Sequence, residues 1–288
     1  MKIAFYISTG KSREKPLCDA WVAGCRATGD ELTVLPNDVP EPVEADIAVM
    51  VGLKSIEFRY RCQEMGQRVL TFDKGYDRKE DWWRVSIDRH QPTHYLMTLD
   101  RPDDRMRSAG WNVSPWRAPD PAAPVIIAGG GRKYYDAHNL PEPVDYIAEI
   151  VERVRTAGSK RKIWYRPKPS MADVVPVPGT LLSRHKSIYD IVPGAHALIT
   201  FGSNACFEAM LSGVPSIILG DAIARPVSSI TIDEIEQPRQ CPENDRLSLL
   251  STLAYCQFRA SEITTGFAIN ELKAQLREVV SDLSHREP

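Results

Sequence analysis

Short apolar runs alternate with longer amphipathic stretches along this chain, and that alternation restricts the possible folds more than any other feature. In the first part, strand-like runs at 2–8, 31–35, 46–51 and 68–72 alternate with helix-like stretches at 15–28 and 55–65. The runs have the length of buried strands, and the stretches between them have the length of the crossover helices that parallel strands require. The pattern predicts a small doubly wound α/β unit.

The same alternation begins again in the second half. Apolar runs at 125–128, 162–165, 197–201 and 215–219 predict four more strands, and a helix is expected over 144–156. A chain of 288 residues is long enough for two α/β domains of ordinary size. We therefore expect two Rossmann-like domains rather than one.

A proline-rich stretch separates the two sets of strands. Residues 115–124 (PWRAPDPAAP) contain four prolines in ten positions. Such a stretch cannot continue a helix or sit inside a sheet, so it is expected to be a stiff linker. The boundary is placed there: a first domain at 1–118 with an insertion rich in tryptophan and charge, and a second at 119–288 that includes the terminal helices.

Composition excludes several classes of protein. The formal net charge of −2 argues against nucleic-acid binding through bulk positive charge. No apolar stretch approaches the roughly 18 residues that span a bilayer, and no signal peptide is evident, so we expect a cytoplasmic protein. The six cysteines form no CxxC pair, which predicts buried free thiols and no zinc site.

The strongest local signal lies between residues 199 and 219. An apolar run leads into Gly202-Ser203-Asn204, which opens a helix that carries Glu208. Backbone amides at a helix start, with the serine and asparagine side chains, suit a phosphate group, and the carboxylate suits a ribose. The alternative is an ordinary α/β core helix with Ser203 as its N-cap.

These residues carry a resemblance to a known family. The run SNACFEAMLSGVPSI (203–217) resembles the donor-binding helix of GT-B glycosyltransferases. SRHKSIYDI (183–191) before ALITFGSN resembles capsule-polysaccharide synthesis enzymes and related phage-encoded, DNA-modifying glycosyltransferases, as do 115–117 and 253–266. In the first half only DKGYD (73–77) and WRVS (83–86) take part. The resemblance implies two Rossmann-like domains that face a central cleft, the first binding the acceptor and the second a nucleotide-sugar.

The resemblance also implies a set of donor-binding residues. They lie in the loops after the predicted strands, in the helix that carries Glu208, and in the loop that in the family borders the nucleotide: Gly130, Gly131, Arg132, Arg166, Lys168, His185, Lys186, Ser203, Asn204 and Glu208. The cationic members would stabilise the charge that grows on the leaving nucleotide, so no metal is required and no cofactor beyond a UDP- or CMP-type sugar is expected. The alternative for Arg166 to Ser170 (RPKPS) is an ordinary surface loop.

An inverting transfer also needs a general base beside the acceptor hydroxyl. In GT-B proteins the base usually comes from the first domain, where Asp73, Asp77, Asp88 and His90 follow apolar runs; Asp88 and Asp73 rank first. Thr9, Gly10 and Lys11 are expected to line the acceptor side. They do not form a P-loop, because the required earlier glycine position holds Phe5.

The sequence is compatible with three functions. The first is transfer of a sugar to a hydroxymethylated pyrimidine in phage DNA, in the host cytoplasm. The second is transfer to a surface or capsular glycan. The third is a nucleotide-sugar epimerase or a non-catalytic nucleotide-sugar-binding protein, because the fold alone excludes neither. DNA binding is suggested by basic residues of the first half together with Tyr60, Tyr76, Trp82 and Trp83. Donor, stereochemical outcome and oligomeric state are left open.

Overall fold

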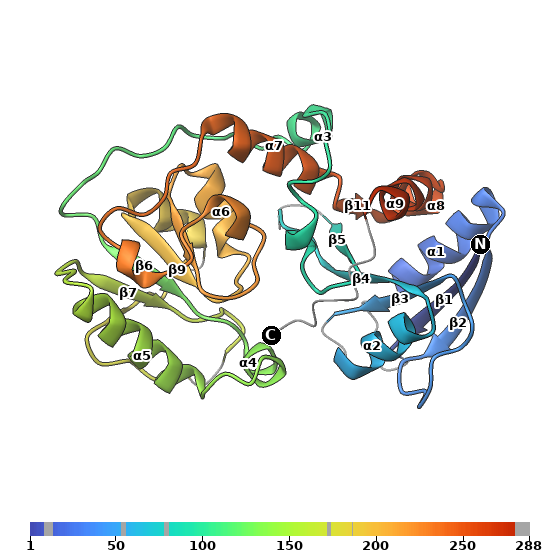
Figure 1. Ribbon diagram of the computed structural model, residues 1–288, viewed down its shortest axis with the longest axis horizontal. Helices are drawn as coiled ribbons and strands as arrows, with labels where there is room; N and C mark the ends of the chain where they lie inside the picture. Colours follow the sequence, from blue (N-terminus) through green and yellow to red (C-terminus); the bar gives the residue numbers. More distant parts are fainter. Residues whose placement is uncertain (9–13, 53–55, 78–80, 172–173, 186, 280–288) are drawn as a thin grey trace. The chain divides into compact units, whose positions relative to one another are not determined.

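The chain folds into two units, each built around its own β-sheet (Figure 1). The computed structural model describes residues 1–8, 14–52, 56–77, 81–171, 174–185 and 187–279. One unit combines Met1–Arg101 with Thr252–Pro288, and the other is Pro102–Ser251. Both units are of the α/β type predicted from the alternation of apolar runs.

The first unit contains a six-stranded sheet with the order β11-β5-β4-β3-β1-β2. Its strands are β1 (Lys2–Ile7), β2 (Glu31–Pro36), β3 (Ile47–Val51), β4 (Arg68–Lys74), β5 (Trp82–Ile87) and β11 (Gln257–Arg259). The first four strands are mutually parallel, whereas β5 pairs antiparallel to β4 and β11 pairs antiparallel to β5. The predicted strands are confirmed, and two antiparallel strands extend the sheet beyond them.

Helices cover both faces of this first sheet. Tyr6, Met50 and Val69 pack on one face against α2 (Ile56–Glu64). On the other face lies α1 (Lys15–Thr28), whose Trp21 contacts Phe5 and Phe72. The short helix α8 (Ala260–Thr264) and α9 (Phe267–Glu278) pack on α1. Glycine at position 24 permits this approach, because a Cβ there would lie 2.1 Å from the carbonyl oxygen of Ile263.

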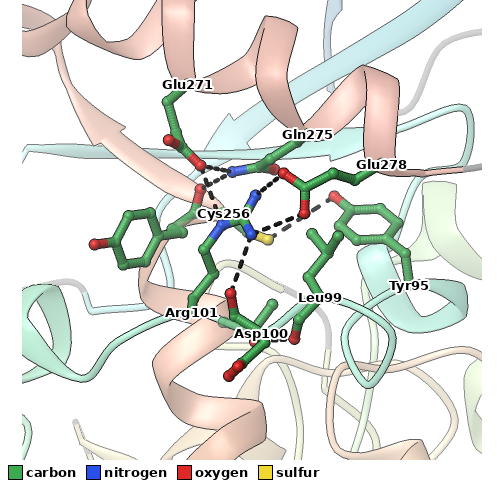
Figure 2. A network of polar contacts seen from close by, with 10 residues as sticks. Tyr95, Leu99, Asp100, Arg101, Cys256, Glu271, Gln275 and Glu278 are labelled. Atoms are coloured by element: carbon green, nitrogen blue, oxygen red, sulfur yellow. Dashed lines mark hydrogen bonds and ion pairs between the residues drawn. The ribbon is translucent and has the colours of Figure 1, made fainter.

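The end of the chain therefore returns to the first unit, which differs from the predicted division at residues 118 and 119. Arg101, where the chain leaves this unit, donates hydrogen bonds to Glu271 and Glu278 of α9 at 3.2 and 2.8 Å (Figure 2). Thr252, where the chain comes back, donates to the carbonyl oxygen of Leu99. The terminal segment belongs here because α8 and α9 pack on α1, and because β11 pairs with β5, which would otherwise be the edge strand of the sheet.

The second unit contains a five-stranded parallel sheet with the order β10-β9-β6-β7-β8. Its strands are β6 (Val125–Ala128), β7 (Ile163–Arg166), β8 (Leu181–Leu182), β9 (Ala197–Thr200) and β10 (Ser216–Ile218). Its helices include α3 (Asp104–Ser108), α4 (Arg132–Ala137), α5 (Pro143–Thr156), α6 (Ala205–Leu211) and the first part of α7 (Glu243–Ala254). The apolar side of α5 packs on one sheet face, and α6 contacts β9 and β10.

The proline-rich stretch is a strap on the second unit and not a linker between the two units. Trp116 donates from its indole nitrogen to the carbonyl oxygen of Cys241 at 2.8 Å, and the fully buried guanidinium of Arg246 lies 4.0 Å from the Trp116 ring centre. Arg117 donates its amide to Gly213, just past the end of α6. The prolines still exclude helix and sheet, as predicted, but aromatic and cation–π contacts fix the strap in place.

All six cysteines are buried and unbridged, as predicted. Burial raises the pKa of the thiols of Cys62, Cys206 and Cys256 to about 12. Within the described part of the chain, no helix combines the length and the apolar composition that crossing a bilayer requires.

Candidate functional site

The second sheet changes its direction of growth next to β6. From β6 the chain adds β7 and β8 on one side, and then crosses over to add β9 and β10 on the other side. In open parallel sheets, ligands bind outside the carboxyl ends of the strands at such a switch point. The switch point here lies between β6 and β9, so the loops that follow these two strands form the candidate ligand site.

Three strands end at the same level at this switch point. Ala128 is the register partner of both Arg166 and Thr200. Thr200 donates its hydroxyl to the carbonyl oxygen of Ala128 at 2.9 Å and accepts the amide of Ser203 at 3.0 Å. Gly129 donates its amide to the carbonyl oxygen of Arg166 at 3.0 Å. The predicted loops after β6, β7 and β9 are therefore brought together at one edge of the sheet.

The amine of Lys168 lies over the glycine loop. A Cβ placed on Gly131 would be 3.1 Å from the Nζ atom of Lys168, which is closer than most Cβ contacts, so the glycine makes room for this side chain. The ring of Tyr135 packs against the same loop, and its hydroxyl is hydrogen-bonded to the backbone of Gly130. Burial raises the pKa of this hydroxyl. The structure thus joins Gly130, Gly131 and Lys168, which the sequence only suggested as separate loop residues.

Tyr134, which the sequence analysis did not single out, ties the loops after β6, β9 and β10 to one another. It lies in α4, directly after the glycine loop, and donates its hydroxyl to the carbonyl oxygen of Asp221 at 3.2 Å. Its ring covers Gly202, where a Cβ would be only 1.8 Å from the tyrosine oxygen. The glycine at position 202 was the only sequence signal of this close approach.

The predicted helix start is shifted by one residue from the expected N-cap. Asn204 and not Ser203 is the N-cap residue of α6, and the hydroxyl of Ser203 accepts the amide of Ala205 at 3.3 Å. Ser203 therefore bonds within the turn that leads into the helix. Glu208 is buried within α6, behind this turn.

Two of the predicted donor residues have other partners. Arg132 forms an exposed ion pair with Glu142, and the ring of His185 stacks on Trp164 with a centroid separation of 5.8 Å and an interplanar angle of 16°. Lys186 lies outside the described residues. So do Thr9, Gly10 and Lys11 in the first unit.

In the first unit, Asp73 and His90 come together near the carboxyl end of β4. The Oδ2 atom of Asp73 lies 3.4 Å from Nη2 of Arg84 and 4.0 Å from Nε2 of His90. Arg84 and His90 are buried, whereas 32% of the Asp73 side chain is exposed. Burial acts to lower the pKa of the Arg84 guanidinium, but the charge of Asp73 and the contact with Tyr76 outweigh it, so the pKa is raised. Asp77 is also buried.

The structure places Asp88 at the opposite edge of the same sheet. Because β5 runs antiparallel to β4, its end lies beside the start of β4. The carboxylate of Asp88 accepts from Nε of Arg68 at 2.7 Å and from the amide of Val69 at 2.9 Å, and Arg68 also donates to the carbonyl oxygens of Leu276 and Val279. These contacts give Asp88 a structural role: it holds Arg68, which connects the start of β4 to the end of α9.

Asp88→Ala is accordingly expected to lower the free energy of unfolding by about 2–4 kcal/mol, because it leaves the largely buried Arg68 guanidinium without its carboxylate. Nucleotide affinity should stay unchanged. Chemical denaturation and calorimetric titration measure the two quantities. Glu44→Ala, which removes a fully solvated partner of Lys2, is the matched control and should change stability by less than about 0.5 kcal/mol. A normal unfolding midpoint for Asp88→Ala would contradict the structural part.

Among the described residues, no group of three or more His, Cys, Asp and Glu side chains is arranged to hold a metal ion.

Comparisons with known proteins address the fold as a whole. The sequence matches no family model, and no curated protein is significantly similar to it. The structure is similar to KpsC of Thermosulfurimonas dismutans, a beta Kdo 2,4 transferase, with a TM-score of 0.53, 12% identity and coverage of 87% of this chain and 90% of that chain. It is also similar to the beta Kdo 2,7 transferase of the same protein, with a TM-score of 0.54, 13% identity and coverage of 94% and 100%. Two sheets of Rossmann type in one chain, matched along nearly the whole length of these transferases, identify the fold as GT-B.

Proposed function

We propose that this protein is a glycosyltransferase that takes a sugar from a nucleotide-sugar. The observation that carries the proposal is the arrangement at the switch point of the second sheet, where the amine of Lys168 lies over the glycine loop. Glycines let a phosphate reach the backbone amides, and the ammonium group supplies the opposite charge. A GT-B fold with such a phosphate cradle fits a nucleotide-sugar better than a free sugar.

The phosphate and the ribose of the donor each have a proposed counterpart among the residues at this edge. Lys168 and Arg166 would hold the phosphate and stabilise the negative charge that develops on it as the sugar leaves. The turn at Ser203 and Asn204 offers further polar groups. Glu208 would accept hydrogen bonds from the ribose hydroxyls.

The acceptor side is assigned to the first unit. Asp73 lies near the carboxyl end of β4 and is partly exposed, so it can receive a proton from an acceptor hydroxyl. Asp88 is left out of this assignment because its carboxylate is already bound by Arg68 and Val69. His90 contacts both Arg84 and Asp73, so we assign it to the same acceptor site.

For the acceptor we propose a sugar hydroxyl of a surface glycan. Both solved structures reported above are named as Kdo transferases with defined sugar linkages, which favours a glycan over DNA. Tyr76, one of the aromatic residues that suggested base stacking, is only 1% exposed and cannot present its ring to an extruded base as it stands. The assay below also includes hydroxymethylated DNA as an acceptor and a reaction without acceptor, which would reveal epimerisation.

The test is a donor-consumption assay with UDP- and CMP-activated sugars, CMP-activated Kdo included. Each donor is offered with a Kdo-terminated glycan, with hydroxymethylated DNA, with unmodified DNA and with no acceptor. We expect turnover that depends on the glycan and that Lys168→Ala abolishes. Turnover with hydroxymethylated DNA alone would replace the acceptor assignment, and isomerisation of a donor without any acceptor would replace transfer by epimerisation. A folded protein that consumes no donor contradicts the proposal.

A further inference from the structure

A cavity of about 220 Å³ lies within the second unit, at the edge of its sheet that the proposed donor site does not use. It is lined in part by residues that come shortly before strands: Ala123 before β6, His196 before β9 and Pro215 before β10. These strands are parallel, so the residues before them share the amino edge of the sheet. The rest of the lining comes from the strap, at 117–120, and from the loop at 236–240.

Hydrogen bonds join the strap to this loop at two points. Gln240 donates from its side-chain nitrogen to the carbonyl oxygen of Arg117 at 3.0 Å. Arg161 donates to the carbonyl oxygen of Asp120 at 2.7 Å and to the carboxylate of Glu236 at 3.1 Å. The two segments are thus held at a fixed spacing, and the cavity between them is preformed.

His196 brings a hydrogen-bond acceptor to the cavity. Its side chain is buried, and its Nε2 atom lies 2.7 Å from the carbonyl oxygen of Ile235. A carbonyl oxygen can only accept, so Nε2 carries the proton. Burial lowers the pKa of the imidazole, so the ring is neutral near pH 7 and Nδ1 keeps its lone pair. Among the described residues, Nδ1 has no hydrogen-bond partner.

Two unpaired charges of opposite sign also line the cavity. The half-buried guanidinium of Arg117 has neither an ion pair nor a hydrogen bond within the part of the chain that the structure describes. The carboxylate of Asp120 accepts a backbone amide of its own turn at 2.8 Å, and its negative charge acts on the imidazole of His196. Arg161 and Glu236 neutralise one another. The cavity therefore has one available cation and one available anion, and the anion lies near the neutral acceptor.

We propose that this cavity binds an α-amino acid with an apolar side chain. The carboxylate of the ligand pairs with Arg117, whose planar guanidinium matches it with two parallel N–H donors. The ammonium group donates to Nδ1 of His196 and to the carboxylate of Asp120. The apolar side chain packs on aliphatic residues of the lining: Ala118, Pro119, Ala123, Ala195, Pro215 and Pro238. The proposal does not depend on the proposed function, because none of these residues belongs to the donor edge.

The experiment is calorimetric titration of the protein near neutral pH with L-valine, L-leucine and L-phenylalanine. Each is compared with the carboxylic acid that lacks its amino group and with the amine that lacks its carboxyl group. We expect at least one amino acid to bind, and both of its counterparts to bind at least about tenfold more weakly, because each has lost one charge-assisted contact. The bound amino acid should also raise the unfolding midpoint.

Variants of the two charged residues test each end of the ligand. Arg117→Gln should reduce the preference for the amino acid over the amine to less than about threefold, because the carboxylate has lost its partner. Asp120→Asn should reduce the preference over the carboxylic acid and leave the preference over the amine unchanged. Arg153→Gln, which removes an exposed guanidinium from α5, is the matched control and should bind like the wild type.

The unfolding midpoint shows whether each variant keeps its fold. If one does not, Ala118→Phe supplies a second test, because a ring at this exposed position of the lining should fill the cavity and abolish binding. Folded wild type that binds none of the three amino acids overturns the proposal. So does equal affinity for an amino acid and either of its counterparts, or a folded Arg117→Gln variant that keeps the full preference over the amine.

Discussion

Alanine at Arg166 or at Glu208 is expected to lower kcat/KM for the donor by roughly 30- to 1,000-fold, which corresponds to about 2–4 kcal/mol of transition-state stabilisation. Arg166 ends β7 next to the glycine loop, and Glu208 is buried in the helix that follows the turn at Ser203. The first change removes a positive charge from the departing phosphate. The second removes the carboxylate assigned to the ribose.

Steady-state donor consumption by the two variants checks this result. Arg153→Ala and Glu152→Ala are suitable controls, because both side chains are exposed on α5 and should leave the rate within about twofold. Circular dichroism and the unfolding midpoint show whether the variants keep their fold. A folded Arg166→Ala or Glu208→Ala variant with the wild-type rate removes that residue from the donor site.

Gly202→Ala is expected to weaken nucleotide binding and turnover by on the order of 100-fold or more. The added Cβ would be 1.8 Å from the Tyr134 oxygen and 2.5 Å from the adjoining ring carbon, so the loop after β9 or the tyrosine must move. A shift of about 1 Å in groups that position a substrate can cost on the order of 100-fold in rate. The loop that moves carries Ser203 and Asn204.

Gly194→Ala provides the matched control in the same unit, since a Cβ there meets no atom within 4 Å. It should bind nucleotide like the wild type. Calorimetric titration of both variants with nucleoside diphosphate gives the comparison. Wild-type affinity in Gly202→Ala would show that the clasp between Tyr134 and this loop does not shape the donor site.

Most of the parallel strands could be predicted from the sequence, but the two-residue strand β8 (Leu181–Leu182) and the antiparallel strands could not. The runs at 2–8, 46–51 and 125–128 are short, apolar and bounded by turn residues, which is a local signal. The strand Gln257–Arg259 has only three residues and forms by pairing with Trp82–Ile87, more than 160 positions earlier. That pairing depends on the rest of the fold and leaves no local pattern.

The candidate site was also predictable only where its residues belong to a local sequence pattern. Carboxyl ends of parallel strands share one edge, so residues at the ends of apolar runs, such as Arg166, could be grouped from the sequence. Asp88 also ends an apolar run, but its strand is antiparallel, and this places it at the far edge. The direction of a strand cannot be read from its own residues. Arg84 and Tyr134 were missed because their parts depend on contacts with Asp73 and Gly202 across the fold.

In the proposed donor site, the carboxyl edge of the second sheet holds the phosphates of an activated sugar. Calorimetric titration of the protein and of its Lys168→Ala variant with UDP, UMP, CDP and CMP tests this placement. We expect the wild type to bind at least one of these nucleotides and the variant to bind it at least about tenfold more weakly. Folded wild type that binds none of the four, or a Lys168→Ala variant with undiminished affinity, would show that the phosphates are not held there.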